Sequence, residues 1–296
     1  MEIKSYLKSR AKLVDKALEG FLPKESVYPF VVHKAMRYSV FAGGKRVRPI
    51  LAIIAAETLG KDPKKVMPVA CAFELIHTYS LIHDDLPCMD DDDLRRGKPT
   101  SHKVFGEAIA VLGGDALLTF AFELAIGNAK IKGVKPEDAI KALQILAEAS
   151  GAAGMIGGQV VDILSENKEP SLPVLQYIHT HKTGALIRAP LLASAALLGA
   201  KKNEYEALKK YGEYLGLIFQ IADDILNVTG DAKKLGKSVG SDAARKKLTY
   251  PSLFGLEESR RQVEELRIKA KAAVEIFAKK SVMLKSLVDF VVERES

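Results

Sequence analysis

Apolar residues recur along nearly the whole chain with the 3.6-residue spacing of an α-helix. Two β-branched runs, at residues 49–54 and 288–292, continue this spacing and have no alternating partner, so we predict helices there as well. The pattern therefore predicts an all-α bundle of about ten or more helices. Clusters of Gly, Pro and polar residues separate these helices at residues 20–29, 42–49, 60–68, 87–102, 127–136, 165–173 and 201–203.

The chain has 296 residues, of which 48% are apolar, and this is enough for an extensive core. No Pro-, Gly- or Ser-rich linker divides it, so we predict one domain over residues 1–296. The segments 108–126 and 186–198 are long and apolar. We expect both to be buried over most of their circumference, as central or interface helices are.

The net charge of +7 raises the question of a nucleic-acid partner. Much of the basic excess lies at residues 201–210 and 260–285, where Lys and Arg alternate with Glu and apolar residues at helical spacing. Such segments are solvated helix faces, because a nucleic-acid surface needs a continuous basic stripe. We therefore expect no nucleic-acid partner.

Cys71 and Cys88 are the two cysteines, and they form no C-x-x-C pair. The sequence thus supports neither a disulfide framework nor a zinc site, and it fits a reducing cytoplasm. Residues 1–10 are too charged for a signal peptide, and the apolar run 189–200 is about half as long as a membrane span requires. We expect a cytoplasmic protein without a membrane span.

Six Asp lie within ten residues at 84–93, and Arg95 and Arg96 follow. A solvated acidic loop is one interpretation of such a run. The preceding helix is apolar on most sides, however, so Asp84 and Asp85 emerge from a buried helix. Clustered carboxylates leaving a buried helix repel one another unless cations neutralise them.

The geometry around Pro87 brings two of these carboxylates together. On a straight helix Asp84 and Asp90 would point apart, because six residues correspond to about 600° of rotation. Pro87 ends or bends the helix and so allows Asp90 to fold back beside Asp84. His77, Ser80 and Asp84 share one face of the helix. Carboxylates without a nearby Cys or His pair suit Mg²⁺ held jointly with a substrate phosphate.

A second acidic pair, Asp223 and Asp224, lies in an otherwise apolar helix at residues 211–228. Gln220, Asp223 and Asn227 share one face, and Asp224 sits one position round. Adjacent buried carboxylates are costly unless they pair with basic side chains or bind a metal, and alone this pair could do either. Beside the first acidic segment, it is interpreted as the other wall of one site.

Residues 43–49 form a glycine-opened turn that carries Lys45, Arg46 and Arg48. The turn is not a P-loop, because the Gly-x4-Gly-Lys-Ser/Thr spacing is missing. It is either an exposed basic loop or a source of two cations for a diphosphate. Local sequence alone gives no evidence of a functional role for Lys182, Thr183 and Lys237. His77 is a candidate site residue only because it shares a helix face with Asp84.

Taken together, the motifs at 43–49, 84–97, 158–162, 182–183 and 219–224 resemble the isoprenyl (polyprenyl) diphosphate synthases of bacterial farnesyl and geranylgeranyl type. The resemblance covers residues 43–250. It implies a central active-site cavity within the all-α fold, a homodimer, and head-to-tail joining of isopentenyl diphosphate to dimethylallyl or geranyl diphosphate. It also implies three Mg²⁺ ions when substrate is bound.

The resemblance assigns roles position by position. It implies that Asp84, Asp90 and Asp223 bind the metal ions while Asp85 and Asp224 support them through waters. It implies that isopentenyl diphosphate is bound by Lys45, Arg48, His77 and Arg96. It implies that the allylic diphosphate is bound by Arg95, Lys182 and Lys237, and that Thr183 and Gln220 face the allyl cation. Asn227 departs from the family, which commonly has Asp there, and this predicts weaker binding of the third ion.

In this family the residues four and five positions before the first motif form the floor of the product cavity, here Ser80 and Tyr79. Periodicity supports Ser80, one turn below Asp84, whereas Tyr79 enters by resemblance. An aromatic side chain about 7.5 Å down the helix should stop chain growth early. We therefore predict farnesyl diphosphate (C15) as the product, with geranylgeranyl diphosphate (C20) as the alternative.

Two other kinds of protein share part of this pattern. A terpene cyclase or head-to-head synthase also ionises allylic diphosphates, but neither needs an isopentenyl diphosphate site. A non-catalytic partner subunit of a prenyl synthase would keep the fold and lose an Asp motif. In this sequence only Asn227 hints at such a loss, so the alternative of a partner subunit stays open.

Overall fold

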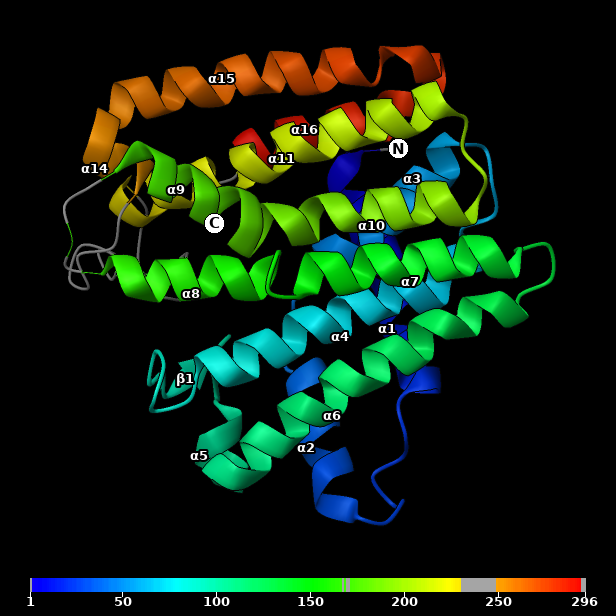
Figure 1. Cartoon of the computed structure of the whole chain (residues 1–296), viewed down its shortest axis with the longest axis vertical. Coiled ribbons are helices and arrows are strands. Elements are labelled where there is room, and N and C mark those ends of the chain that lie inside the picture. Colours follow the sequence, from blue (N-terminus) through cyan, green and yellow to red (C-terminus); the bar gives the residue numbers. More distant parts are fainter. Residues whose placement is uncertain (1, 167, 169–170, 230–248, 294–296) are drawn as a thin grey trace.

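The computed structural model describes residues 2–166, 168, 171–229 and 249–293, and these are helical nearly throughout (Figure 1). The predicted all-α fold is confirmed. The α-helices are α1 (Ile3–Phe21), α2 (Phe30–Val40), α3 (Val47–Thr58), α4 (Met67–Asp84), α5 (Ser101–Phe105), α6 (Glu107–Ile126), α7 (Pro136–Ser150), α8 (Met155–Ser165), α9 (Leu172–Ile178), α10 (Gly184–Leu197), α11 (Lys202–Thr229), α14 (Tyr250–Phe254), α15 (Leu256–Ala273) and α16 (Val282–Val292).

Short irregular elements connect several of these helices. They are the 3₁₀ turns η1 (Pro63–Val66), η2 (Gly127–Lys130) and η4 (Glu275–Ser281), and the π-helical turn η3 (His179–Thr183). Two strands of two residues each, β1 (Leu94–Arg95) and β2 (Lys98–Pro99), form an antiparallel hairpin in which Leu94 faces Pro99. The β-branched runs at 49–54 and 288–292 lie in α3 and α16, as predicted.

The long helices lie roughly side by side. Figure 1 shows α15, α11, α10, α7, α4 and α6 following one another across the molecule. Helix α4 packs against α6 and α3, and α10 packs against α11, α7 and α3. Buried apolar side chains form one cluster around α4, which includes Phe73 and Leu117, and a second around α11, which includes Tyr211 and Ile218. The core thus fixes α4 and α11 as the two helices around which the others pack.

The two long apolar segments differ in burial. Helix α10 is buried on most sides, as expected. Helix α6 is not: Leu112 is 55% exposed, and Val111 and Ile126 are also exposed. The reason is that α6 packs one face on α4 and lies at the edge of the molecule (Figure 1).

By length and composition alone, one helix in the described residues is apolar enough to cross a membrane. It covers Glu107–Lys130, has a mean hydropathy of 1.8, and is 33% buried. The sequence predicted this helix at 108–126 as a central or interface helix, and only the shorter run at 189–200 was weighed as a membrane span. Core helices of proteins that never enter a membrane pass the same test, so the feature is weak evidence for a span.

Candidate active site

A cavity of about 1270 Å³ lies between the C-terminal ends of α4 and α11. It exceeds the usual volume of a small-molecule site and is large enough for two substrates. Fourteen of the predicted site residues line it: Lys45, Arg48, His77, Tyr79, Ser80, Asp84, Asp90, Arg95, Arg96, Lys182, Thr183, Gln220, Asp223 and Asp224. Among the other two, Asp85 lies directly behind the cavity wall, and Lys237 lies outside the described residues.

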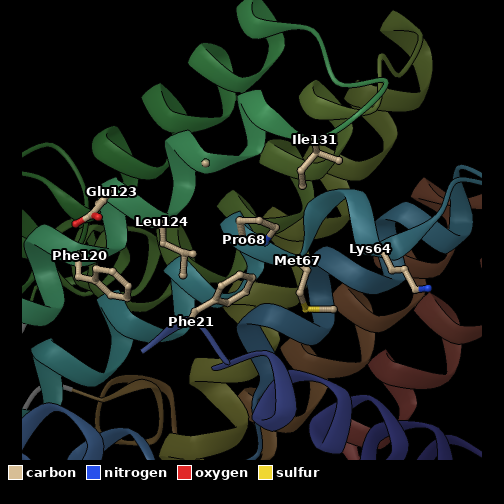
Figure 2. Close-up of a pocket in the computed structure, with 9 residues that line it drawn as sticks. Phe21, Lys64, Met67, Pro68, Phe120, Glu123, Leu124 and Ile131 are labelled. Atoms are coloured by element: carbon tan, nitrogen blue, oxygen red, sulfur yellow. The ribbon is translucent and has the colours of Figure 1, made fainter. Parts of the chain in front are cut away.

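A second pocket, of about 480 Å³, opens at the other end of α4 (Figure 2). Met67 and Pro68 line it, together with Phe21 and Leu124. Met67 is about 25 Å along the helix from Asp84. None of the predicted site residues that the structure describes lines this pocket, so the candidate active site is the larger cavity.

The first acidic segment folds as the position of Pro87 predicts. Helix α4 ends at Asp84, and the backbone N–H of Asp90 donates to the carbonyl of Asp84 at 2.8 Å. The turn therefore returns Asp90 to the end of the helix. Burial raises the pKa of Asp84 to about 6; Lys182 opposes the rise and the carboxylate of Asp90 adds to it. A buried carboxylate next to another one favours a cation at this position.

Asp85 lies behind the wall and contacts a basic side chain. Its Oδ1 atom accepts a hydrogen bond from Nε of Arg95 at 2.9 Å, and Nη2 of Arg95 donates to Oδ2 of Asp92 at 3.0 Å. Asp85 is buried, with 4% of its surface exposed. These contacts hold the Arg95 guanidinium, which lines the cavity, in one orientation.

The glycine turn before α3 brings cations into the cavity from the other side of α4. Gly44 has a φ of 138°, which favours glycine, and a Cβ there would lie 2.5 Å from Nη1 of Arg96 and would displace this guanidinium. Nη1 of Arg96 donates a hydrogen bond to the Gly43 carbonyl. The turn and the β1–β2 hairpin thereby bring Lys45, Arg48 and Arg96 to one region of the cavity.

The basic side chains of this region repel one another. Burial lowers the pKa of Arg48 to about 10, and the charge of Arg96 lowers it as well, against the attraction of Glu74. Burial and then the neighbouring arginines hold the pKa of His77 well below its usual range. His77 is therefore neutral at pH 7 and presents hydrogen-bonding nitrogens without charge. An anion such as a diphosphate would relieve the repulsion between the guanidinium groups.

Helix α11 and the turn η3 form the opposite wall. Oγ1 of Thr183 donates to Oε1 of Gln220 at 2.8 Å, and Nε2 of Gln220 donates to Oδ1 of Asp224 at 3.0 Å. Oδ2 of Asp224 accepts from the backbone N–H of Tyr250 at 3.0 Å. This chain of hydrogen bonds fixes the Gln220 amide and joins α11 to the start of α14.

Lys182 also reaches the cavity from the π-helical turn. Its Nζ atom donates to Oδ2 of Asp162 on α8 at 2.6 Å. A π-helical turn inserts an extra residue into a helix and is frequent at functional sites. The adjacent side chains of Lys182 and Thr183 in this turn both line the cavity.

The carboxylates fit divalent ions that are shared with a substrate. Within the described residues, no three His, Cys, Asp or Glu side chains lie close enough to hold an ion by themselves. Asp84 and Asp90 line one wall, and Asp223 and Asp224 line the other. Magnesium usually keeps several waters and binds one or two carboxylates together with substrate phosphates, so sparse oxygen ligands facing a cation-lined cavity suit it.

Sequence reasoning missed the role of two residues next to this site. Glu74 and Arg46 are buried, with 2% and 3% of their surfaces exposed, and they form an ion pair at 2.9 Å in the wall of the same cavity. In the sequence, Arg46 was noted only as one of three basic residues in the turn, and no pattern indicated a role for Glu74. Their pairing joins positions 28 residues apart, which periodicity cannot reveal.

The sequence profile of the polyprenyl synthetase family matches residues 30–284. The chain belongs to this family. Members are trans-prenyltransferases, and they use divalent metal ions to bind diphosphates. The match covers both acidic segments and the glycine turn, so the family resemblance inferred from those motifs is confirmed.

Named relatives are similar over most of their length. The chain is 51% identical to heterodimeric geranylgeranyl pyrophosphate synthase large subunit 1 of Arabidopsis thaliana, over 90% of this chain and 72% of the relative. It is 46% identical to geranylgeranyl pyrophosphate synthase of Capsicum annuum, over 99% and 79%. Among solved structures, an FPP/GFPP synthase from Zymomonas mobilis is similar with a TM-score of 0.85, 38% identity and 98% of each chain covered.

Proposed function

We propose that this protein is a short-chain trans-prenyltransferase that joins isopentenyl diphosphate head to tail to an allylic diphosphate. One observation carries the proposal: a single cavity has carboxylates on two walls and a separate group of cations, Lys45, Arg48 and Arg96, beside one of them. A terpene cyclase has no use for the second group. The presence of both acidic pairs, at 84–90 and 223–224, supports an active enzyme over a non-catalytic partner subunit.

In this proposal, the reaction starts with ionisation of the allylic diphosphate. Asp84, Asp90 and Asp223 would hold Mg²⁺, and the bound ions would supply positive charge that favours departure of the allylic diphosphate. Arg95 and Lys182 bind the same diphosphate. The C–O bond at the allylic carbon breaks, the electron pair leaves with the diphosphate, and the double bond of isopentenyl diphosphate attacks that carbon. Basic groups placed before the reaction need no reorganisation as charge develops on the leaving group.

The allyl cation needs a surrounding that stabilises it without trapping it. Thr183 and Gln220 already hydrogen-bond to each other, so they present fixed dipoles instead of a free nucleophile. Departure of a proton from the isopentenyl unit completes the condensation. We assign the proton to the released diphosphate, which is the strongest base that the reaction itself leaves in the cavity.

The direct test is to incubate the enzyme with Mg²⁺, isopentenyl diphosphate and labelled C5, C10 or C15 allylic diphosphates, and to size the products. We expect elongation of at least one primer and loss of elongation when a chelator removes the metal. A chain that elongates none of the three primers would contradict the proposed function.

For the product we propose geranylgeranyl diphosphate, the alternative of the sequence analysis, because the named relatives favour it. Farnesyl diphosphate is the second candidate, and one observation favours it. Tyr79 lines the cavity, is 4% exposed, and packs its ring edge-on against His83 with 5.6 Å between ring centroids. A ring held in this way narrows the cavity below Asp84.

Tyr79→Ala is expected to lengthen the main product by at least one C5 unit, because it removes the ring and leaves space along α4. Chromatography of the dephosphorylated products measures the chain length. Tyr38→Ala is the control, since the half-buried Tyr38 ring packs edge-on against Phe105 and does not line the cavity, so this change should leave the product unchanged. An unchanged product in Tyr79→Ala would contradict the assignment of Tyr79 to the cavity floor.

We also propose a homodimer in which α6 of one subunit packs against α6 of another. The exposed apolar side chains of this helix, Val111, Leu112 and Ile126, support the proposal. Apolar helix faces of this kind usually pack in a subunit interface.

Leu112→Glu is expected to convert the dimer to a monomer, because it would place a charge in the apolar interface. Sedimentation velocity at micromolar concentration measures the mass. Ile268→Glu is the matched control: Ile268 is 63% exposed on α15, across the molecule from α6 (Figure 1). A wild-type protein that sediments as a monomer would contradict the proposed assembly.

A further inference from the structure

Arg46 combines a buried charge with an unusual backbone. Its side chain is 3% exposed, and its φ of 51° and ψ of 35° lie in the left-handed region. Residues other than glycine seldom adopt this conformation, and they keep it where the surrounding structure fixes them. The adjacent glycines explain the turn before Arg46, but they do not explain why an arginine occupies this position.

Three helices hold the Arg46 guanidinium. Its Nε atom donates to Oδ1 of Asp15 on α1 at 2.8 Å. Nη1 donates to Oε1 of Glu74 on α4 at 2.9 Å, and Nη2 donates to the carbonyl of Val40 at the end of α2 at 2.7 Å. Each of the three guanidinium nitrogens of Arg46 therefore has a hydrogen-bond acceptor, and these bonds fix the backbone of Arg46 relative to α4.

The position of Arg46 determines where its neighbours point. Lys45 precedes it and Arg48 follows two residues later, and both line the cavity. The carbonyl of Arg46 accepts from the N–H of Ile50 at 3.1 Å and so opens α3. A change of φ and ψ at Arg46 would reorient Lys45 and shift the first turn of α3, which carries Arg48.

Besides its ion pair with Arg46, Glu74 interacts electrostatically with Arg48 and Arg96. Its Oε2 atom is buried, and no hydrogen-bond partner for it is found among the described residues. Its charge attracts Arg48 and Arg96, which burial would otherwise push towards the neutral form. Glu74 thus helps to hold the charged forms of the two arginines that repel each other.

We propose that Arg46 and Glu74 are a positioning pair for the diphosphate of isopentenyl diphosphate, acting through Lys45 and Arg48. The inference rests on the proposed function, because it assumes that this region binds isopentenyl diphosphate. Arg46 and Glu74 are not among the proposed substrate ligands, and their role in this proposal is to position those ligands. The pair carries no net charge, so its contribution is the placement of the ligands and not additional attraction.

A charge-neutral double substitution separates placement from charge. Arg46→Gln with Glu74→Gln keeps a polar side chain at both positions and the net charge of the pair, but removes the guanidinium that joins three helices. Arg46→Met with Glu74→Leu is a second version that suits an apolar surrounding if the first fails to fold. Circular dichroism and thermal melting check the fold of both variants.

Calorimetry with isopentenyl diphosphate alone, without an allylic partner, measures binding when no condensation can occur. We expect the folded double variant to bind isopentenyl diphosphate about tenfold more weakly or worse, because misplaced ligands lose most of their interaction. Affinity for geranyl diphosphate with Mg²⁺ should stay within about twofold, since its ligands lie on other elements. The KM for isopentenyl diphosphate should rise in parallel, with little change in kcat.

The matched control is Glu19→Gln with Arg37→Gln, which removes another Arg–Glu pair, between α1 and α2, outside the cavity. Its affinities should equal those of the wild type. Unchanged isopentenyl diphosphate binding in a folded double variant would overturn the inference, as would equal weakening of both substrates or a wild type that does not bind isopentenyl diphosphate. A wild type that binds it but elongates no primer would contradict the proposed function alone.

Discussion

Asp84→Asn is expected to lower kcat/KM by about 10³-fold, because it removes a charged metal ligand where charge develops on the leaving group. Asp84 occupies the last position of α4, and Asp90 returns to it through a backbone hydrogen bond of 2.8 Å. Steady-state rates over a range of Mg²⁺ concentrations measure the effect. The apparent affinity for Mg²⁺ should fall in the same variant.

Asp91→Asn is the control for this substitution. Asp91 belongs to the same acidic run but is exposed, and its φ of 49° is a conformation that Asn tolerates. Its kcat/KM should stay within about twofold of the wild type. If Asp84→Asn retained more than a tenth of wild-type activity with an unchanged Mg²⁺ requirement, Asp84 would not be a metal ligand.

Gly158→Ala is expected to destabilise the protein by about 1–3 kcal/mol and to reduce kcat by about 10²-fold. A Cβ at Gly158 would lie 2.2 Å from the backbone nitrogen of Lys182 and 2.6 Å from its Cα. The clash involves backbone atoms, so the turn η3 must move away from α8. Lys182 and Thr183 would move with it, and both line the cavity.

Thermal melting and steady-state kinetics test this prediction together. Gly20→Ala is the matched control, because Gly20 lies in α1 and a Cβ there meets no atom within 4 Å. It should raise stability slightly, since Ala favours a helix more than Gly does. A Gly158→Ala variant with normal stability and normal kcat would show that α8 and η3 can separate without consequence.

In the two acidic segments, the features that depend on local sequence were predicted correctly, whereas the start of the second helix was not. Pro87 and the spacing of six residues were enough to predict that Asp90 returns to Asp84, because the effect of proline on a helix is local. The second segment was placed in a helix from 211 to 228, whereas α11 extends from Lys202 to Thr229. The polar first turns of α11 lack the apolar pattern that marks a buried helix.

Longer-range contacts escaped the sequence for a different reason. Asp85 and Asp224 were predicted to support metal ions through waters, and their roles stay predictions. The structure adds that Asp85 contacts Arg95 and that Asp224 accepts hydrogen bonds from Gln220 and Tyr250. Whether a carboxylate is met by a protein donor depends on elements that pack beside it, and this is invisible along one helix.

The sequence by itself determined the all-α fold, the two acidic segments and the family, because helical periodicity and the spacing of charged residues are local properties. The tertiary structure decided which cations share the cavity, how the Arg46–Glu74 pair fixes the glycine turn, and that α6 keeps an open apolar face. These features depend on helices that meet after folding. The physical reason is that burial and pairing are set by packing between segments distant in sequence, and packing assigns each side chain its environment.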